Sequence, residues 1–256
     1  MCLGYGVIVT DVVILVGVGV LAGLVSTIVS LASIVSYPAL LALGIPPLSA
    51  NVTNTVALLF SAVGATAGSQ RELEGQRGRV IRLGALTALG GAVGAALLLL
   101  TPGSAFERVA PMLIAAACLV LLVQPRLTKA AARAGGEHSV LLRLGVFAVA
   151  IYTGYFGAAG GILTLAILAA MLELPLIRVN AIKNVVAGLS NGVAALGFAL
   201  FGPVRWVAVL PLAAGFLTGG WIGPSLVRRL PAQVLRVIVV VCGVAVAVKL
   251  GVDAYT

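Results

Sequence analysis

Long apolar runs without a single charge dominate the chain. The longest covers residues 12–70, and six further uncharged runs follow at 83–106, 109–125, 144–172, 184–204, 206–227 and 237–248. Most of these runs are about as long as a helix that crosses a hydrocarbon core of roughly 30 Å. They are continuously apolar, whereas the strands of a membrane barrel alternate over about ten residues. The pattern predicts an all-α integral membrane protein.

The first apolar run is too long for one crossing. Residues 5–44 supply 40 positions, roughly twice the number that a spanning helix needs. We expect this stretch to fold back as a helical hairpin, either fully spanning or re-entrant. Three ordinary spans follow at 49–67, 80–100 and 107–123. The first residues lack the pattern of a cleaved signal, so we expect the hairpin to remain in the mature protein.

The second half of the chain repeats the first. With an ungapped offset of 129, residues 43–97 overlay 172–226 with 14 identities in 55 positions. The informative matches are Pro46 with Pro175, Asn51 with Asn180, Ser61 with Ser190, Gly68 with Gly197, and Gly90, Gly91 and Gly94 with Gly219, Gly220 and Gly223. We expect ten helical segments in two five-segment repeats, each opening with a hairpin. The predicted divisions are an N-terminal repeat (1–125), a basic cytoplasmic linker (126–143) and a C-terminal repeat (144–256).

An odd number of crossings in each half inverts the second repeat relative to the first. If the N-terminus lies outside, thirteen basic residues fall on the cytoplasmic side, and only Arg108, Arg205 and Lys249 fall outside. A parallel arrangement would send Arg178 and Lys183 outward with the other charged loops of the second half. The positive-inside bias therefore favours inverted repeats. It predicts a multi-pass protein of the cell (cytoplasmic) membrane with both termini outside.

Small residues mark the expected turn of each hairpin. The second hairpin has Gly157, Gly160 and Gly161, and the first has Ser30 and Ser33 in the corresponding region. Glycine permits a helix break whose free backbone N–H groups can hold an anion. Close helix packing is the alternative interpretation of the glycines. The serine hydroxyls can donate to an oxyanion or bond to their own helix.

Side-chain amides open the helix that follows each hairpin. In the second half the polar positions are Asn180, Lys183, Asn184 and Asn191, and in the first half they are Asn51, Asn54 and Thr55. Their spacing places them along one helix face. Amides inside a membrane face protein or a water-filled cavity, so they either line a site for a polar ligand or hold helices together. Lys183 either attracts an anion or extends its amine to the cytoplasmic surface.

Several other classes of function find no support. Residues 188–192 match G-x-S-x-G, but no histidine lies in an apolar run to act as the base. The three cysteines and one histidine have no metal-ligand spacing. The basic residues are scattered among short loops, unlike a nucleic-acid-binding stripe. We expect no enzyme activity, catalytic residue, cofactor, metal or nucleic-acid partner. An interior of amides, hydroxyls and glycines, almost without acids, suits anions or neutral polar solutes.

Several of these segments resemble one family of membrane permeases. They are TGYFGAAGGILTL at 153–165, LGIPPLSANVTNTVAL at 43–58, LELPLIRVNAIKN at 172–184, the two glycine clusters, and RRLP at 228–231. Together they resemble the sulfite exporter TauE/SafE family, which carries sulfur-containing anions, and the resemblance covers nearly the whole chain. That family usually has a glycine-rich stretch in both hairpins, and here only the second hairpin has one. The resemblance implies export of sulfite, a sulfonate such as sulfoacetate, or a related small anion.

We therefore expect a secondary transporter that exports a small sulfur-containing anion by alternating access. The alternatives are an anion channel, an importer of another anion, or a membrane subunit without transport activity. The expected substrate site consists of Ser30, Ser33, Asn51, Asn54, Thr55, Gly157, Gly160, Gly161, Asn180, Lys183, Asn184 and Asn191. The expected partners are the anionic substrate and the lipid bilayer, with a coupling ion and a second copy of the chain as further candidates.

Overall fold

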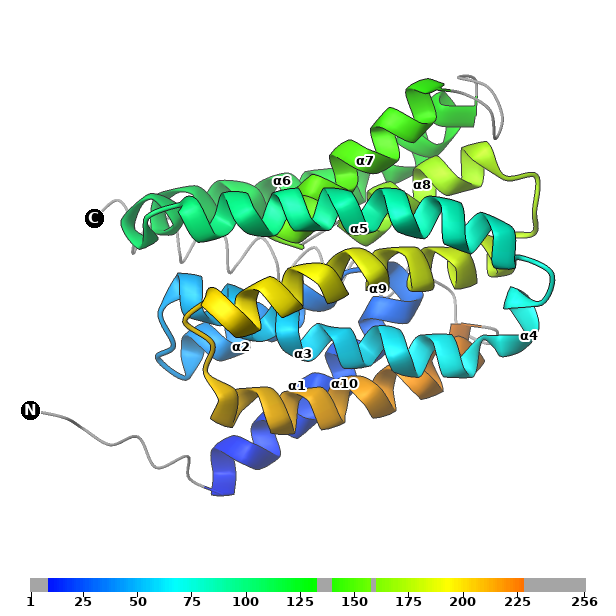
Figure 1. Ribbon diagram of the computed structural model, residues 1–256. Coiled ribbons are helices and arrows are strands. Elements are labelled where there is room, and N and C mark those ends of the chain that lie inside the picture. The colour runs from blue at the N-terminus through cyan, green and yellow to red at the C-terminus, as the bar shows by residue number, and fades with distance from the viewer. Residues whose placement is uncertain (1–8, 133–139, 158–159, 228–256) are drawn as a thin grey trace, which may run out of the picture.

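The computed structural model describes residues 9–132, 140–157 and 160–227, and these residues are almost entirely helical (Figure 1). The helices are α1 (Val9–Val29), α2 (Ala32–Ala42), α3 (Pro47–Gly68), α4 (Gln70–Leu73), α5 (Arg77–Leu100), α6 (Gly103–Ala132), α7 (Val140–Tyr155), α8 (Gly160–Met171), α9 (Leu176–Phe201) and α10 (Trp206–Val227). The predicted all-α fold is confirmed. The short α4 was not predicted, and α6 continues through 126–132 of the predicted linker. The last predicted segment, 237–248, lies outside the described residues.

Two broken hairpins open the two halves of the chain. In the first, α1 stops before Ser30, whose φ of 63° is left-handed and unusual for a residue with a side chain. In the second, Gly157 has a φ of 78° between α7 and α8. The returning helices, α2 and α8, have 11 and 12 residues, or about 16–18 Å of length. Each return is thus too short to span a membrane core, in agreement with the re-entrant alternative.

A proline starts the long helix after each hairpin. Pro46 and Pro175 are the N-cap residues of α3 and α9, with φ near −55° and extended ψ. Proline fixes φ near the helical value and has no N–H to lose, so it suits the beginning of a helix. The two helices pack against each other at the centre of the molecule and run in opposite directions (Figure 1).

Each half contributes one helix that packs against the other half. α5 from the first half packs on α7 and α9 of the second, and α10 from the second half packs on α1 and α3 of the first. The sequence repeat aligns α5 with α10 and α3 with α9. This reciprocal packing agrees with the predicted inverted repeat, which stays a prediction.

Glycine lets the helices of the two halves approach each other closely. A Cβ on Gly91 would lie 2.7 Å from Ser190 Oγ, and one on Gly220 would lie 2.5 Å from the Ser61 carbonyl oxygen. Both glycine and serine positions are related by the offset of 129. Only a residue without a side chain allows backbones to approach in this way.

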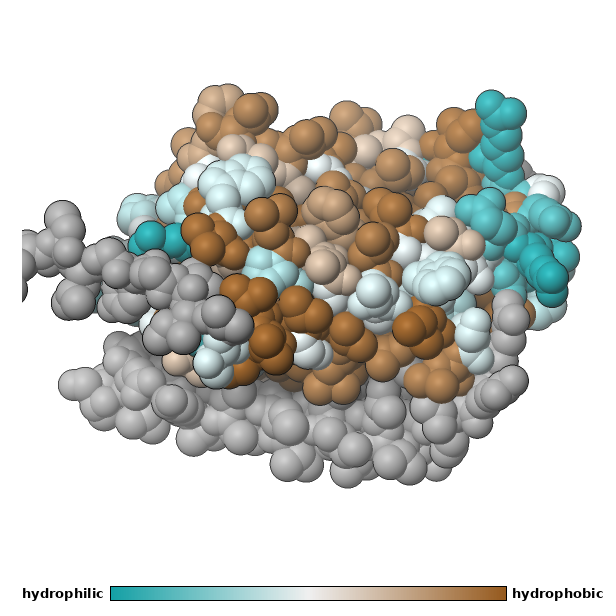
Figure 2. Space-filling view, turned by 90° about the horizontal axis from the view of Figure 1, so that it is seen from below, coloured by the Kyte–Doolittle hydropathy of each residue, from teal (hydrophilic) through white to brown (hydrophobic). Residues whose placement is uncertain are grey.

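The outer surface is suited to lipid. Five helices, α1, α3, α5, α9 and α10, are long and apolar enough to cross a membrane. Large apolar side chains such as Leu100, Phe201 and Leu210 are at least 74% exposed. Figure 2 shows apolar residues over most of one face and hydrophilic residues gathered at the end where α4 lies. The chain is a multi-pass membrane protein.

The close contact between α1 and α10 is tested by two glycines on the same helix. A Cβ at Gly19 would lie 2.5 Å from the Leu212 carbonyl oxygen, whereas a Cβ at Gly17 would meet nothing within 4 Å. We expect Gly19→Ala to lower the free energy of unfolding by about 1–3 kcal/mol. Gly17→Ala should be neutral or slightly stabilising, since alanine favours helix. Thermal unfolding in detergent measures both, and equal midpoints for the two variants would contradict the packing.

Candidate functional site

The tips of the two hairpins meet beside α3 and α9. A Cβ on Gly161 would lie 2.7 Å from Ser30 Cβ, and one on Gly157 would lie 3.9 Å from Ser33 Oγ. A cavity of about 50 Å³ opens at this junction and is lined by residues of both tips, α3 and α9. Its polar lining side chains are Ser26, Ser30, Ser33, Ser61, Thr153, Lys183, Asn184 and Asn191.

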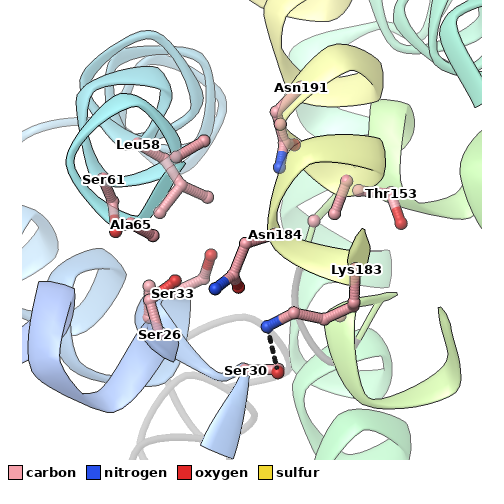
Figure 3. A pocket seen from close by; sticks show the side chains of 16 residues that line it. Ser26, Ser30, Ser33, Leu58, Ser61, Ala65, Thr153, Lys183, Asn184 and Asn191 are labelled. Carbon is pink, nitrogen blue, oxygen red and sulfur yellow. Dashed lines mark hydrogen bonds between the residues drawn. The ribbon is translucent and has the colours of Figure 1, made fainter. Parts of the chain in front are cut away.

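Lys183 supplies an amine to this cavity. Its side chain projects from α9 toward the tip of the first hairpin (Figure 3), and Nζ donates a hydrogen bond to Ser30 Oγ at 2.7 Å. The residue is only 3% exposed, so it does not extend its amine to the membrane surface. No acidic side chain of the described residues lines the cavity. A positive charge on this amine would therefore have no carboxylate within the described lining to balance it.

Three buried polar atoms in the lining have no hydrogen-bond partner within the described part of the chain. They are Asn184 Nδ2, Asn191 Oδ1 and Ser61 Oγ. Each such atom costs about 1–3 kcal/mol when it is buried without a partner. An amide has both donors and an acceptor and can turn to present either. These groups are therefore suited to a polar ligand that enters the cavity.

Two helix N-termini also reach the cavity. Ala32 and Ser33 belong to the first turn of α2, and Gly161 belongs to the first turn of α8. The N-cap residue of α2, Leu31, makes no side-chain capping bond. Free N–H groups and the positive end of the helix dipole favour an anion at such a position. The electrostatics of the lining thus favour negative charge.

Two of the predicted amides hold the hairpin tips instead. Asn51 Nδ2 on α3 donates to the Tyr155 carbonyl oxygen of the second hairpin at 3.1 Å, and Asn180 Nδ2 on α9 donates to the Thr27 carbonyl oxygen of the first at 3.2 Å. Both carbonyls belong to the last turn of a helix, where backbone oxygens have no partner within the helix. Each half of the chain therefore caps the broken helix of the other half.

The first-half polar cluster is likewise satisfied by protein. Asn54 donates to Ser33 Oγ at 3.1 Å and accepts a bond of 2.5 Å from Ser36 Oγ. Thr55 donates to the Asn51 carbonyl oxygen of its own helix at 2.9 Å. Gly160 starts α8 in close contact with the Thr153 side chain. These groups have partners that are independent of any ligand.

The structure thus separates the twelve predicted site residues into two groups. Those that line the cavity are Ser30, Ser33, Gly157, Gly161, Lys183, Asn184 and Asn191. Those absent from the lining are Asn51, Asn54, Thr55, Gly160 and Asn180.

Sequence reasoning missed Ser26, Ser61 and Thr153 as lining residues. Ser61 carried one signal, because it matches Ser190 in the repeat. Ser190 itself, the serine of the G-x-S-x-G match, is 1% exposed and donates to the Ala150 carbonyl oxygen at 3.3 Å. It lies in the contact between α9, α5 and α7.

Known proteins match this sequence over nearly its whole length. The model of the family described as sulfite exporter TauE/SafE matches residues 15–250. The chain is 25% identical over 234 residues to the probable membrane transporter protein ORF9 of Sinorhizobium sp, covering 91% of this chain and 89% of that protein. It is 25% identical over 241 residues to the probable membrane transporter protein YfcA of Escherichia coli K12, covering 93% and 88%. No solved structure matches the chain.

The capping role of Asn51 can be tested by comparison with Thr55, which lies one turn further along α3. We expect Asn51→Ala to lower the free energy of unfolding by about 1–3 kcal/mol, because the partly buried Tyr155 carbonyl loses its donor. Thr55→Val removes a bond within the helix only and should change stability by less than about 0.5 kcal/mol. Thermal unfolding of both variants measures the difference. A neutral Asn51→Ala would rule out the cap.

Proposed function

The chain belongs to the sulfite exporter TauE/SafE family, and on this premise we propose that it transports a small sulfur-containing anion across the cell membrane. The observation that carries this proposal is the cavity in which a buried lysine, unpartnered amides and two helix N-termini meet without an acid in the described lining. Such a set of groups is complementary to an oxyanion, which accepts hydrogen bonds at every oxygen.

Each group in the lining has a distinct role in this proposal. Lys183 supplies the compensating charge, and Asn184 and Ser61 donate to the oxygens of the anion. The first turns of α2 and α8 contribute backbone N–H groups and dipole potential. The cavity volume of about 50 Å³ is a few times the roughly 10–15 Å³ that one water needs on the same measure, which is the space of a small group of waters. A compact anion such as sulfite fits this volume better than sulfoacetate, which requires the cavity to widen.

The lining favours access from one side of the membrane. The cavity is bordered by the second half of α3, at Leu58–Ala65, and by the middle of α9, at Lys183–Asn191. The second half of α3 and the start of α9 lie toward the end of the bundle that contains α4 (Figure 1). If the basic loops at this end are cytoplasmic, with both termini outside, the cavity loads from the cytoplasm, as an exporter requires.

Alternating access then requires a second arrangement of the same parts. Lys183 and Asn184 are equivalent by the repeat to Asn54 and Thr55, which are engaged with protein groups here. We infer that movement of the hairpins against α3 and α9 closes the present cavity and opens its counterpart on the other side. The inverted repeat supports this exchange, because the two states are then related by the pseudo-twofold axis.

Binding is tested by thermal unfolding of the purified protein with sulfite, methanesulfonate, sulfoacetate, sulfate, chloride and a neutral solute. A ligand at 100 times its Kd stabilises the folded state by about 2.7 kcal/mol, so sulfite or a sulfonate should raise the midpoint selectively. Asn184→Ala should weaken the affinity roughly tenfold, since it removes a donor in the cavity. The control Thr218→Ala removes only bonds within α10. If no anion changes the midpoint, or if both variants respond as the wild type does, the proposed site is wrong.

Transport is tested with proteoliposomes loaded with sulfite. Carrier-type export should saturate with concentration and should be accelerated by sulfite on the opposite side. A flux that rises linearly without such exchange would favour the channel, and binding without flux would favour a subunit that does not transport.

A further inference from the structure

Among the described residues, Lys183 is the one ionisable side chain that lines the cavity. α9 packs against α3, α4, α5, α7 and α8, of which α3 and α8 contain no ionisable side chain. Ionisable groups do occur on the other three helices, on the α8–α9 connection, at the start of α9 and on the first hairpin. They are Asp11, Tyr37, Arg71, Glu72, Arg77, Arg79, Arg82, Arg143, Tyr152, Tyr155, Glu173 and Arg178. None of them lines the cavity. Within the described residues, the protonation of Lys183 therefore depends mainly on what occupies the cavity.

A positive charge on Lys183 is unfavourable in the empty cavity and favourable when an anion is bound. An ammonium group buried without a counter-charge costs free energy, since one hydroxyl replaces its hydration. The positive ends of α2 and α8 add to that cost. An anion in the same cavity reverses the sign of the interaction, because the ammonium then has a partner in a water-poor site. Binding of a proton and binding of an anion must therefore favour each other.

The hydrogen bond to Ser30 is compatible with both forms of the lysine. A neutral amine accepts from the serine hydroxyl, and an ammonium donates to the hydroxyl oxygen, so the contact of 2.7 Å between Nζ and Oγ serves either. When Nζ is the donor, two of its N–H groups and the Ser30 proton remain for the oxygens of an anion. Protonation thus converts Ser30 from a donor to the lysine into a donor to the substrate.

We propose that Lys183 binds one proton together with each anion and releases both together, so that the protein couples anion transport to protons. This inference rests on the proposed function of the same cavity. In the binding step a neutral amine, a proton from water on the side of entry and an anion form one N–H bond and an ammonium–anion pair. Release reverses these changes on the other side. A monoanion then crosses without net charge, and the anion and proton gradients together set the direction.

The pH dependence of methanesulfonate affinity tests this coupling. Methanesulfonate stays ionised throughout the assay, so its own protonation does not contribute. For the wild type, affinity should fall about tenfold per pH unit at alkaline pH, because each bound anion takes up one proton. In Lys183→Arg the guanidinium stays charged, and the affinity should not change with pH. Calorimetry in two buffers with different heats of ionisation should show about one proton taken up per anion by the wild type and none by Lys183→Arg.

Two further variants show whether the pH dependence of affinity comes from Lys183. Lys183→Met should lose affinity at every pH, whereas Asn184→Ala should weaken binding and keep the wild-type slope. If only sulfite binds, the same titrations are run with sulfite, and Lys183→Arg reveals any proton that the ligand itself carries. A wild-type affinity that is flat with pH, or a Lys183→Arg slope equal to that of the wild type, would overturn the coupling alone. Absence of binding by any anion at any pH would overturn the proposed function instead. Should the Lys183 variants fail to fold, the wild-type slope, proton uptake and Asn184→Ala decide the question.

Discussion

A helix that ends inside a membrane protein leaves backbone carbonyl and N–H groups that lipid cannot satisfy. Both hairpins of this protein contain such an end, and two asparagines meet the requirement from the opposite half of the chain. Asn51 donates to the Tyr155 carbonyl, and Asn180 donates to the Thr27 carbonyl. With the carbonyl ends held by protein, the N-terminal ends of α2 and α8 are left to face a ligand. In the proposed site, the caps therefore occupy one end of each break and leave the other end to the ligand.

The exchanged packing of the two halves limits which movements the proposed site could make. α5 and α10 each lie against the other half through glycines, and Gly91 and Gly220 approach Ser190 and Ser61 too closely for any side chain. Contacts of this kind favour rigid pairs of helices over gradual deformation. The hairpin tips also meet closely, since a Cβ on Gly161 would lie 2.7 Å from Ser30 Cβ, but this contact lies at the turns of the hairpins and not along paired helices. The proposed movement of the tips would therefore break a short contact and leave the long helix contacts in place.

Much of the fold follows from the sequence, because the apolar runs, the prolines at 46 and 175 and the length of the first run are local features. The glycine-rich motif also predicts the second break, whereas the first break uses a left-handed Ser30, which composition does not reveal. The amide spacing identifies Asn184 and Asn191 as lining residues, but it does not separate them from Asn180, which reaches a backbone carbonyl. That distinction depends on which carbonyl lies within reach across a helix contact. The same limit applies to Lys183, because its sequence position is the same whether its side chain points into the protein or toward the membrane surface.

Locating the bound anion would test the proposed site directly. Crystals of the protein with selenite, in which selenium takes the place of sulfur in sulfite, allow the selenium position to be found by anomalous diffraction. We expect one peak in the cavity between Lys183 Nζ, Asn184 Nδ2 and the first turns of α2 and α8. A peak elsewhere on the protein, with this cavity empty at saturating selenite, would contradict it.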